Sequence, residues 1–219
     1  METAKTTLSD DEAWFVASRW QQLAGEHRAN HLRILAIVAF YLVHLVQHYQ
    51  PGGLLKSDTP PDQIFHVALT VIVAGWLLMA LTIDFSLRLR IFPLFTPYVT
   101  TGLDLALLTA ILCLGGGQAS PLILGYFLIL ILSALRFSLP LVRAATAAAI
   151  VSYLYLLAMG KWPHLFGDRI IGVVPRYHQI ITLLAIGITG IVLGQMIRRF
   201  RAMAKHYAER RFGRTTDEQ

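Results

Sequence analysis

Residues 177–197 read YHQIITLLAIGITGIVLGQMI and contain no Lys, Arg, Asp or Glu. A helix of ~20 apolar residues is long enough to cross the hydrocarbon core of a bilayer. Further charge-free runs occupy residues 34–55, 63–83, 105–135 and 144–160. Only 15% of the 219 residues are charged, against ~25% in an average soluble protein. The sequence therefore predicts an all-α, polytopic membrane protein rather than one or two soluble domains.

Six transmembrane helices are predicted from the apolar runs and the turn residues between them. They cover residues 32–50, 64–87, 97–114, 121–137, 141–159 and 176–197. Turn residues stand at the breaks, among them Pro51, Pro93, Pro140 and the run Gly115-Gly116-Gly117, because proline interrupts a helix and glycine tolerates positive φ. The prediction divides the chain into an N-terminal segment (1–30), a transmembrane domain (31–197) and a basic tail (198–219).

The distribution of basic residues predicts the orientation of these spans. Six spans put both termini on one side, and that side would hold 15 of the 19 Lys and Arg residues. The positive-inside rule then places both termini in the cytoplasm of a multi-pass protein of the bacterial inner (cytoplasmic) membrane. The net charge of +6 follows from this topology. A basic tail beside a span meets anionic membrane lipid more readily than nucleic acid, so no nucleic-acid partner is expected.

The polar N-terminal segment is predicted to form a short amphipathic helix on the membrane surface. Ser9 and Glu12 fit a capping box, which satisfies the first free amides of a helix. Val16, Trp20 and Leu23 follow at helical spacing, as in helices that lie in the membrane interface. A frayed terminal segment is the alternative.

The sixth helix is expected to continue beyond the membrane to about residue 212, because no proline follows residue 197. Phe200, Met203 and Tyr207 have the spacing of a coiled-coil seam. Such a seam would serve a homodimer or a partner protein. The alternative is a basic tail whose aromatic side chains dip into lipid.

Histidines gather on the outer side of the predicted bundle. His44 and His48 lie one turn apart in the first span, while His66 and His178 begin the second and sixth spans from the outer side. An opposed pair, such as His48 with His178 or His66 with His178, could hold the iron of haem b. Three or four imidazoles could hold a transition metal. The alternatives are interfacial histidines at headgroup level and a quinone or proton-linked pocket.

Asp104 is the single charged residue between Ile91 and Leu135. A carboxylate near the bilayer centre costs roughly 2.5–3.5 kcal/mol, so a partner is expected. Candidates are Thr100, Thr101 and Thr109 on the same helix, or arginines at the inner helix ends. Asp104 either fixes helix packing through hydrogen bonds or takes part in a proton relay.

Gly187, Gly190 and Gly194 form a stripe along the predicted sixth span. Small residues on one face of a transmembrane helix allow a neighbouring helix to approach closely. We interpret the stripe as a packing face within the bundle, with dimerisation as the alternative.

The sequence lacks several enzyme signatures. It has no HExxH, no G-x-S-x-G and no Walker loop, which mark zinc proteases, α/β-hydrolases and P-loop NTPases. Its single cysteine, Cys113, allows neither an intramolecular disulfide nor a cysteine-based zinc cluster. We therefore expect no enzymatic activity.

Three stretches in the middle of the chain carry a resemblance to a known family. They read DLALLT at residues 104–109, GGGQASP at 115–121 and YFLILILSALRFS at 126–138. Together they resemble the six-span membrane input module of bacterial signalling proteins. That module occurs in the sensor kinase of type IV pilus regulation and other histidine kinases, in diguanylate cyclases and in class III adenylyl cyclases. There it lies directly before a cytoplasmic helix and an effector domain.

The resemblance implies a sensor-like role, with two departures. We expect no kinase, cyclase or receiver domain after the last predicted span, and the outer histidines are not typical of the family. We therefore expect an integral membrane sensor-like or interaction module that works through partner proteins. The alternative is a membrane b-type haem or metal-binding subunit that uses the outer histidines in electron transfer.

Overall fold

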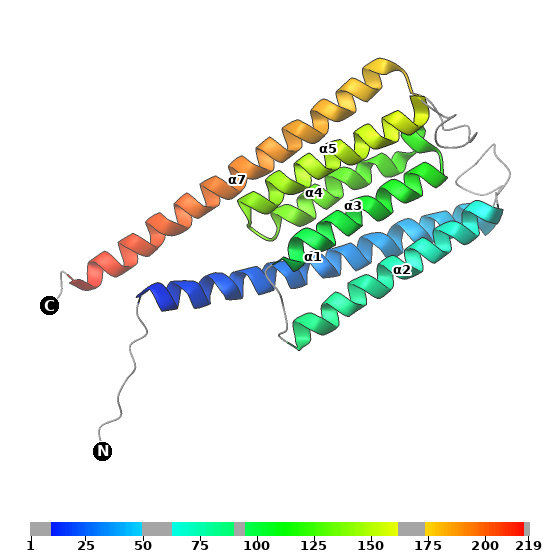
Figure 1. Ribbon diagram of the computed structural model, residues 1–219. Coiled ribbons are helices and arrows are strands. Elements are labelled where there is room, and N and C mark those ends of the chain that lie inside the picture. Colours follow the sequence, from blue (N-terminus) through cyan, green and yellow to red (C-terminus); the bar gives the residue numbers. More distant parts are fainter. Residues whose placement is uncertain (1–9, 50–62, 90–94, 162–173, 217–219) are drawn as a thin grey trace.

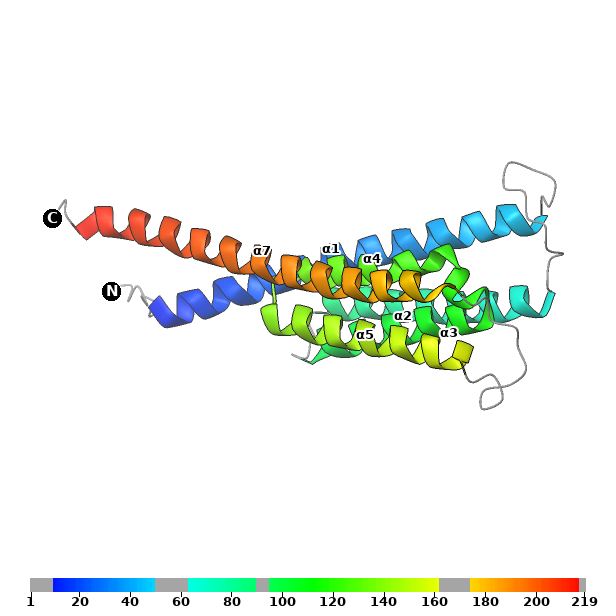
Figure 2. The same cartoon turned by 90° about the horizontal axis from the view of Figure 1, so that it is seen from above.

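The computed structural model describes residues 10–49, 63–89, 95–161 and 174–216, and every regular element in these ranges is helical. The elements are α1 (Asp10–Tyr49), α2 (Gln63–Arg88), α3 (Thr96–Leu114), η1 (Gly117–Ala119), η2 (Pro121–Ile123), α4 (Leu124–Ala134), α5 (Leu139–Lys161) and α7 (Arg176–Thr216). The α-helices run in alternating directions, so the beginning of α1 and the end of α7 project from the same end of the bundle (Figures 1 and 2). We call this the terminal end, marked by Glu26 and Arg136, and the opposite end, marked by His48 and His66, the far end.

Five of the described helices are long and apolar enough to cross a membrane. These stretches are Gly25–Tyr49, Gln63–Arg88, Thr96–Leu114, Leu139–Lys161 and Arg176–Ala204. Their outward faces carry many exposed large apolar side chains, such as Leu35, Val71 and Ile188. A continuous apolar surface of this kind is unfavourable in water and marks contact with another apolar phase. The described part of the chain is therefore an all-helical membrane bundle.

The predicted fourth span is shorter than expected. The apolar helical segment covers Pro121–Ala134, divided into the single turn η2 and the 11 residues of α4. It begins at the predicted residue, Pro121, where the Ser120 side chain caps η2 by accepting a hydrogen bond from the Leu122 amide at 3.3 Å. Its end is set by Phe137, whose φ of 51° leaves the helical region.

The first helix also differs from the prediction. In place of a separate surface helix, α1 runs through 40 residues without a break. Ser9 of the predicted capping box lies outside the described residues. Gly25 does not interrupt α1, since one glycine costs a helix only about 1 kcal/mol. Gly25 instead allows close approach, because a Cβ there would lie 2.8 Å from the Leu135 carbonyl oxygen.

The predicted extension of the last helix is confirmed. Helix α7 continues unbroken over 41 residues, from Arg176 to Thr216. Phe200 and Met203 of the predicted seam are about half exposed. The side chain of Tyr207 lies outside the described side chains.

Two packed groups of apolar side chains form the interior. The larger group joins α3, α4, α5 and α7 through Leu105, Leu112, Tyr126, Leu130, Ala149, Tyr153 and Ile186. The smaller group places the α1–α2 pair against α3 through Ile37, Leu69, Val73 and Ile111. Gly190 allows α7 to pack closely on α5 within the larger group, because a Cβ there would overlap the Thr146 side chain of α5. The packing interpretation of the glycine stripe is thus confirmed at Gly190, whereas a Cβ on Gly187 would meet nothing within 4 Å.

Candidate functional site

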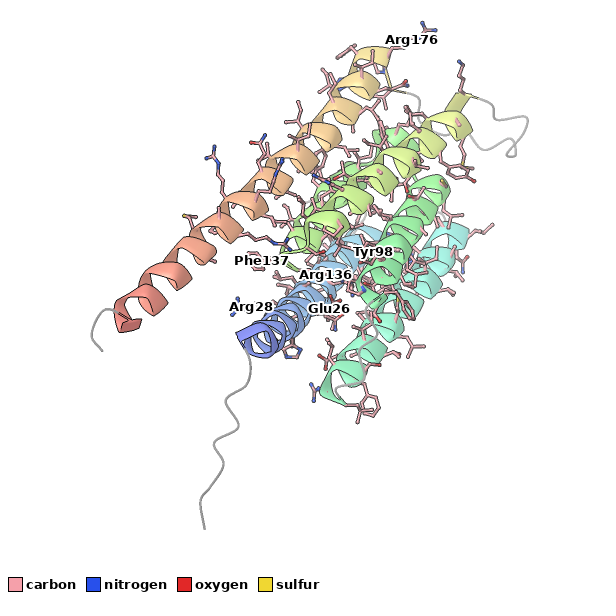
Figure 3. The ribbon with its side chains drawn as sticks, turned by 60° about the vertical axis from the view of Figure 1, so that its left-hand side comes forward. Glu26, Arg28, Tyr98, Arg136, Phe137 and Arg176 are labelled. Carbon is pink, nitrogen blue, oxygen red and sulfur yellow. The ribbon has the colours of Figure 1, made fainter. Side chains whose placement is uncertain are left out.

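Arg136 is the centre of a buried polar cluster at the terminal end. Its Nη2 donates hydrogen bonds to Glu26 Oε1 at 2.7 Å and Thr100 Oγ1 at 3.0 Å. Its Nη1 donates to the Pro97 carbonyl at 2.6 Å and to Thr101 Oγ1 at 2.9 Å. Figure 3 shows Glu26 and Arg136 close together where α1 meets the turn after α4. One side chain therefore connects α1, α3 and the α4–α5 turn.

Asp104 belongs to a second buried ion pair beside the first. Arg33 of α1 donates to Asp104 Oδ2 from Nε at 2.9 Å and from Nη2 at 2.8 Å. Trp76 of α2 donates to Asp104 Oδ1 at 2.7 Å. Asn30 accepts from Arg33 Nη1 at 3.0 Å and donates to the Ala80 carbonyl at 2.9 Å. This second pair thereby fastens α1 to both α2 and α3.

The predicted partners of Asp104 are thus partly corrected. Its ion-pair partner is Arg33, one of the arginines that the second alternative covers. Thr100 and Thr101 instead accept hydrogen bonds from Arg136. Thr109 shares a 2.9 Å hydrogen bond with Tyr126 Oη. Both oxygens of Asp104 accept hydrogen bonds from side chains of neighbouring helices, which suits a fixed packing contact better than a proton relay.

The two pairs bury two positive and two negative groups. Glu26, Arg33, Asp104 and Arg136 are all at most 4% exposed. Burying an ion costs several kcal/mol unless its charge is paired and its hydrogen bonds are made. Arg33 pairs with Asp104 at 2.8 Å and Arg136 pairs with Glu26 at 2.7 Å, so each buried charge has its counter-ion.

The turn that contains Arg136 also contacts α7. The Phe137 carbonyl accepts a hydrogen bond from Arg201 Nη2 at 2.6 Å. The Phe137 ring meets the Phe200 ring edge to face, with centroids 6.4 Å apart. Residues 136–138 are therefore a junction that touches α1 on one side and α7 on the other. Both helices extend past this junction, away from the bundle (Figure 2).

At the far end, the structure brings together three of the four histidines proposed from the sequence. His44 Nε2 lies 3.1 Å from His66 Nδ1, a hydrogen-bond distance. The His48 and His66 rings stack at 3.9 Å with an angle of 7° between their planes. His178 begins α7, is exposed, and packs against the Tyr177 ring. Helices α2 and α7 lie on opposite sides of the bundle (Figure 1), so His178 is apart from the other three.

A groove of about 440 Å³ lies between α3 and α5. Its lining is mainly apolar, with the hydroxyls of Thr109 and Ser152 and the thiol of Cys113 as small polar groups among Ala106, Ala110, Val151, Tyr155 and Met159. Its lining contains no charged side chain. The groove is therefore suited to an acyl chain rather than to a charged ligand.

The sequence reasoning missed Glu26, Asn30 and Arg136 as members of the buried cluster. A signal was present for two of them. Glu26, Asn30 and Arg33 are spaced i, i+4 and i+7, which puts three polar groups on one face of a helix that is entering an apolar span. Arg136 directly follows a long charge-free run, and only the tertiary contact shows its partner.

The fold and this cluster define an all-helical membrane protein. Buried ion pairs at its terminal end join α1 to α3 and to the α4–α5 turn. Comparisons of the chain with protein-family models, with curated proteins and with solved structures give no match. Its function is therefore argued from its own residues.

Proposed function

We propose that this chain is a sensor-like signalling module of the bacterial inner membrane, which passes changes in its helix bundle to partner proteins through α7. The observation that carries the proposal is the junction at residues 136–138. Arg136 binds Glu26 of α1, and Phe137 binds Arg201 of α7. A shift of α1 against α3 and α4 would move this turn, and the turn would move α7.

The proposed topology has six spans with both termini in the cytoplasm. The alternating helix directions support it, because α4 and its flanking turn return the chain between α3 and α5 (Figure 1). The basic residues agree with it. Exposed arginines gather at the terminal end, at positions 28, 88, 143, 198, 199 and 201, whereas Lys161 and Arg176 lie at the far end. The positive-inside rule puts the terminal end in the cytoplasm.

Residues in two of the stretches that carry the resemblance make buried polar contacts between helices. Asp104 of the DLALLT stretch binds Arg33, and Thr109 of the same stretch binds Tyr126. Arg136 of the third stretch binds Glu26. The residues that carry the resemblance thus make buried polar contacts between helices, which is the kind of feature that fixes a helix arrangement.

The output surface of this proposal is the part of α7 beyond the junction. Phe200 and Met203 remain about half exposed, at the spacing of a helix–helix seam. A partner helix or a second copy of the chain would pack there. A seam of this length is too short to associate alone, since isolated helices below ~12–15 residues are marginal, so the membrane bundle would have to hold the partners near one another.

A chimera tests whether α7 transmits a signal. The catalytic domain of a class III adenylyl cyclase, which works as a dimer, is joined after Thr216, and one to four alanines are inserted after Ala204. Two inserted residues rotate the following helix by ~200°, whereas four return it to within ~40° of its starting phase. We expect cyclase output to change most with two alanines and to recover with four. A flexible Gly-Ser segment at the same position is the control and should remove the dependence on phase. Equal output from all insertions would reject transmission through α7.

The proposed topology has its own test. Reporter fusions after Leu55, Gln118 and Gly167 are expected outside, and fusions after Arg90, Leu139 and Gln219 inside. A reversed or mixed pattern at two or more of these sites would contradict six spans with cytoplasmic termini.

A haem or metal subunit that works in electron transfer is the alternative function. The three clustered histidines at the far end favour ring stacking over axial ligation, because rings 3.9 Å apart leave no room for a porphyrin between them. An absorption spectrum of the purified protein separates the two functions. A Soret band that shifts on reduction, and that is lost in His178→Ala, would favour the haem subunit over the signalling module.

A further inference from the structure

A second group of histidines lies at the terminal end, between α1 and α2 and outside the buried ion pairs described above. His27 and His31 are one turn apart on α1, and Asp84 reaches them from α2. One nitrogen or oxygen atom of each residue lies within 4.8 Å of the others. Two imidazoles at i and i+4 on one helix face are a recurrent arrangement for binding a metal ion.

The hydrogen bond of His31 leaves its second ring nitrogen able to bind a metal ion. Its Nδ1 lies 2.8 Å from the His27 carbonyl oxygen. A carbonyl only accepts hydrogen bonds, so Nδ1 carries the proton, and the neutral ring presents its lone pair at Nε2. Metal-binding histidines usually donate their other ring N–H to a carbonyl or carboxylate in this way, which fixes the tautomer and the ring orientation.

Asp84 supplies the independent observation. Its side chain is 14% exposed, and its Oδ2 accepts a hydrogen bond from Arg88 Nε at 2.9 Å. Its Oδ1 is buried and has no hydrogen-bond partner among the described residues. A buried oxygen without a partner is costly, so the arrangement favours a ligand at Oδ1.

The distance between His27 and Asp84 fits such a ligand. His27 Nδ1 lies 3.5 Å from Asp84 Oδ1, which is longer than an ordinary N–H···O hydrogen bond. Two ligand atoms bound to one tetrahedral ion at 2.0–2.2 Å are roughly 3.3–3.5 Å apart. The pair is therefore spaced as two ligands of one ion.

We propose that His27, His31 and Asp84 bind one divalent transition-metal ion, which bridges α1 and α2 at the terminal end. Two imidazoles and one carboxylate suit ions such as Zn²⁺, Fe²⁺ or Co²⁺. Three protein ligands leave one position for water or another ligand. The bridge adds to the contact that Asn30 makes with the Ala80 carbonyl between the same two helices. An occupied site fixes the start of α1 against α2 whether or not the chain signals.

The test uses the full-length protein in detergent, with Co²⁺ absorption for coordination and Zn²⁺ competition for affinity. The parent is the triple variant His44→Gln, His48→Gln, His66→Gln, which removes the far-end imidazoles as competing ligands. We expect one equivalent of Co²⁺ with visible d–d bands, displaced by one equivalent of Zn²⁺. His31→Gln and Asp84→Asn, each added to the parent, should weaken Zn²⁺ binding by at least about 100-fold.

The matched control is His178→Gln, which removes an exposed histidine elsewhere and should leave binding unchanged. Zn²⁺ should raise the melting temperature of the parent and of this control, but not that of the His31→Gln variant. Melting without metal shows whether each variant is folded. No binding by the parent, or equal binding by the His31→Gln and Asp84→Asn variants, would overturn the proposal.

Discussion

Different kinds of contact hold α1 at the terminal end and at the far end of the bundle. At the terminal end, Glu26 and Arg33 form buried ion pairs with Arg136 and Asp104, at nitrogen–oxygen distances of 2.7–2.9 Å. At the far end, partly exposed histidine rings stack on His66 of α2, and one hydrogen bond joins two imidazoles. Charge-assisted hydrogen bonds fix both distance and direction. Stacked rings tolerate sideways displacement, because offset arrangements are also favourable.

This contrast indicates at which end of the bundle the position of α1 is more tightly fixed. Displacement at the far end leaves stacked rings near one another, whereas displacement at the terminal end strands a charge in an apolar environment. We therefore expect α1 to adapt at the far end and to transmit force at the terminal end. The predictions below compare the two ends directly.

The largest loss of stability is expected from Arg136→Gln. This change leaves Glu26, which is 1% exposed, without its cation. Removing one partner of a buried ion pair typically costs about 3–5 kcal/mol, so we expect a loss of that size in the free energy of unfolding in mixed micelles. Arg143→Gln is the control, because Arg143 is exposed and surface changes usually stay within about 0.5 kcal/mol. Equal stability of the two variants would show that the Glu26–Arg136 pair does not hold α1 in place.

The double variant Glu26→Gln, Arg136→Gln tests whether the loss of stability comes from the interaction between these two residues. Each single variant leaves a buried charge, whereas the double variant removes both charges. We expect the double variant to lose less stability than the sum of the two single losses, by at least about 1 kcal/mol. Simple additivity would mean that Glu26 and Arg136 act separately.

A smaller loss of stability is expected in the middle of the bundle, where α7 packs on α5. Gly190→Ala places a methyl group against Thr146, whereas Gly187→Ala on the same helix meets nothing within 4 Å. Overpacking typically costs about 1–3 kcal/mol, and alanine in an open helical site is favoured over glycine by up to about 1 kcal/mol. Thermal unfolding should therefore show a loss for the first variant and no loss for the second. The same change in both would argue against close packing at Gly190.

The smallest effect is expected at the far end, from His66→Phe. Phenylalanine keeps an aromatic ring beside His48 and loses only the hydrogen bond to His44. A single hydrogen bond contributes about 0.5–1.5 kcal/mol net, so unfolding should change by no more than that. A loss as large as that of Arg136→Gln would remove the contrast between the ends.

Much of the fold could be predicted from the sequence, because apolar runs and turn residues are local features. The bounds of α2, α3 and α5 agree with the predicted spans to within a few residues, and the extension of α7 follows from its lack of proline. The length of α4 was overestimated, because the charge-free run reaches Leu135 and the positive φ of Phe137, which ends the helical path, is not visible in the sequence. The continuity of α1 was missed because its first half is polar and lacks a transmembrane pattern.

The site was less predictable, since the sequence indicates which side of the membrane a residue is near but does not specify which helices are neighbours. His44, His48, His66 and His178 were expected to gather on the outer side, but α7 lies across the bundle from α2 (Figure 1), so His178 is apart from the others. For Asp104, the need for a partner was predictable from its cost in the membrane. The choice of Arg33 depends on α1 packing beside α3.

The central claim is that the buried polar cluster around Arg136 couples α1 to α7. Electron spin resonance can test it by measuring distances between the two helices. Spin labels would be placed at Arg28→Cys and Arg199→Cys, two exposed positions, in a Cys113→Ser background. The unaltered cluster should give one narrow distance distribution. Glu26→Gln, which removes a charge but keeps the side-chain size, should broaden or shift it, and His66→Phe at the far end should not. An unchanged distribution in the Glu26→Gln variant would contradict the coupling of α1 to α7 through Arg136.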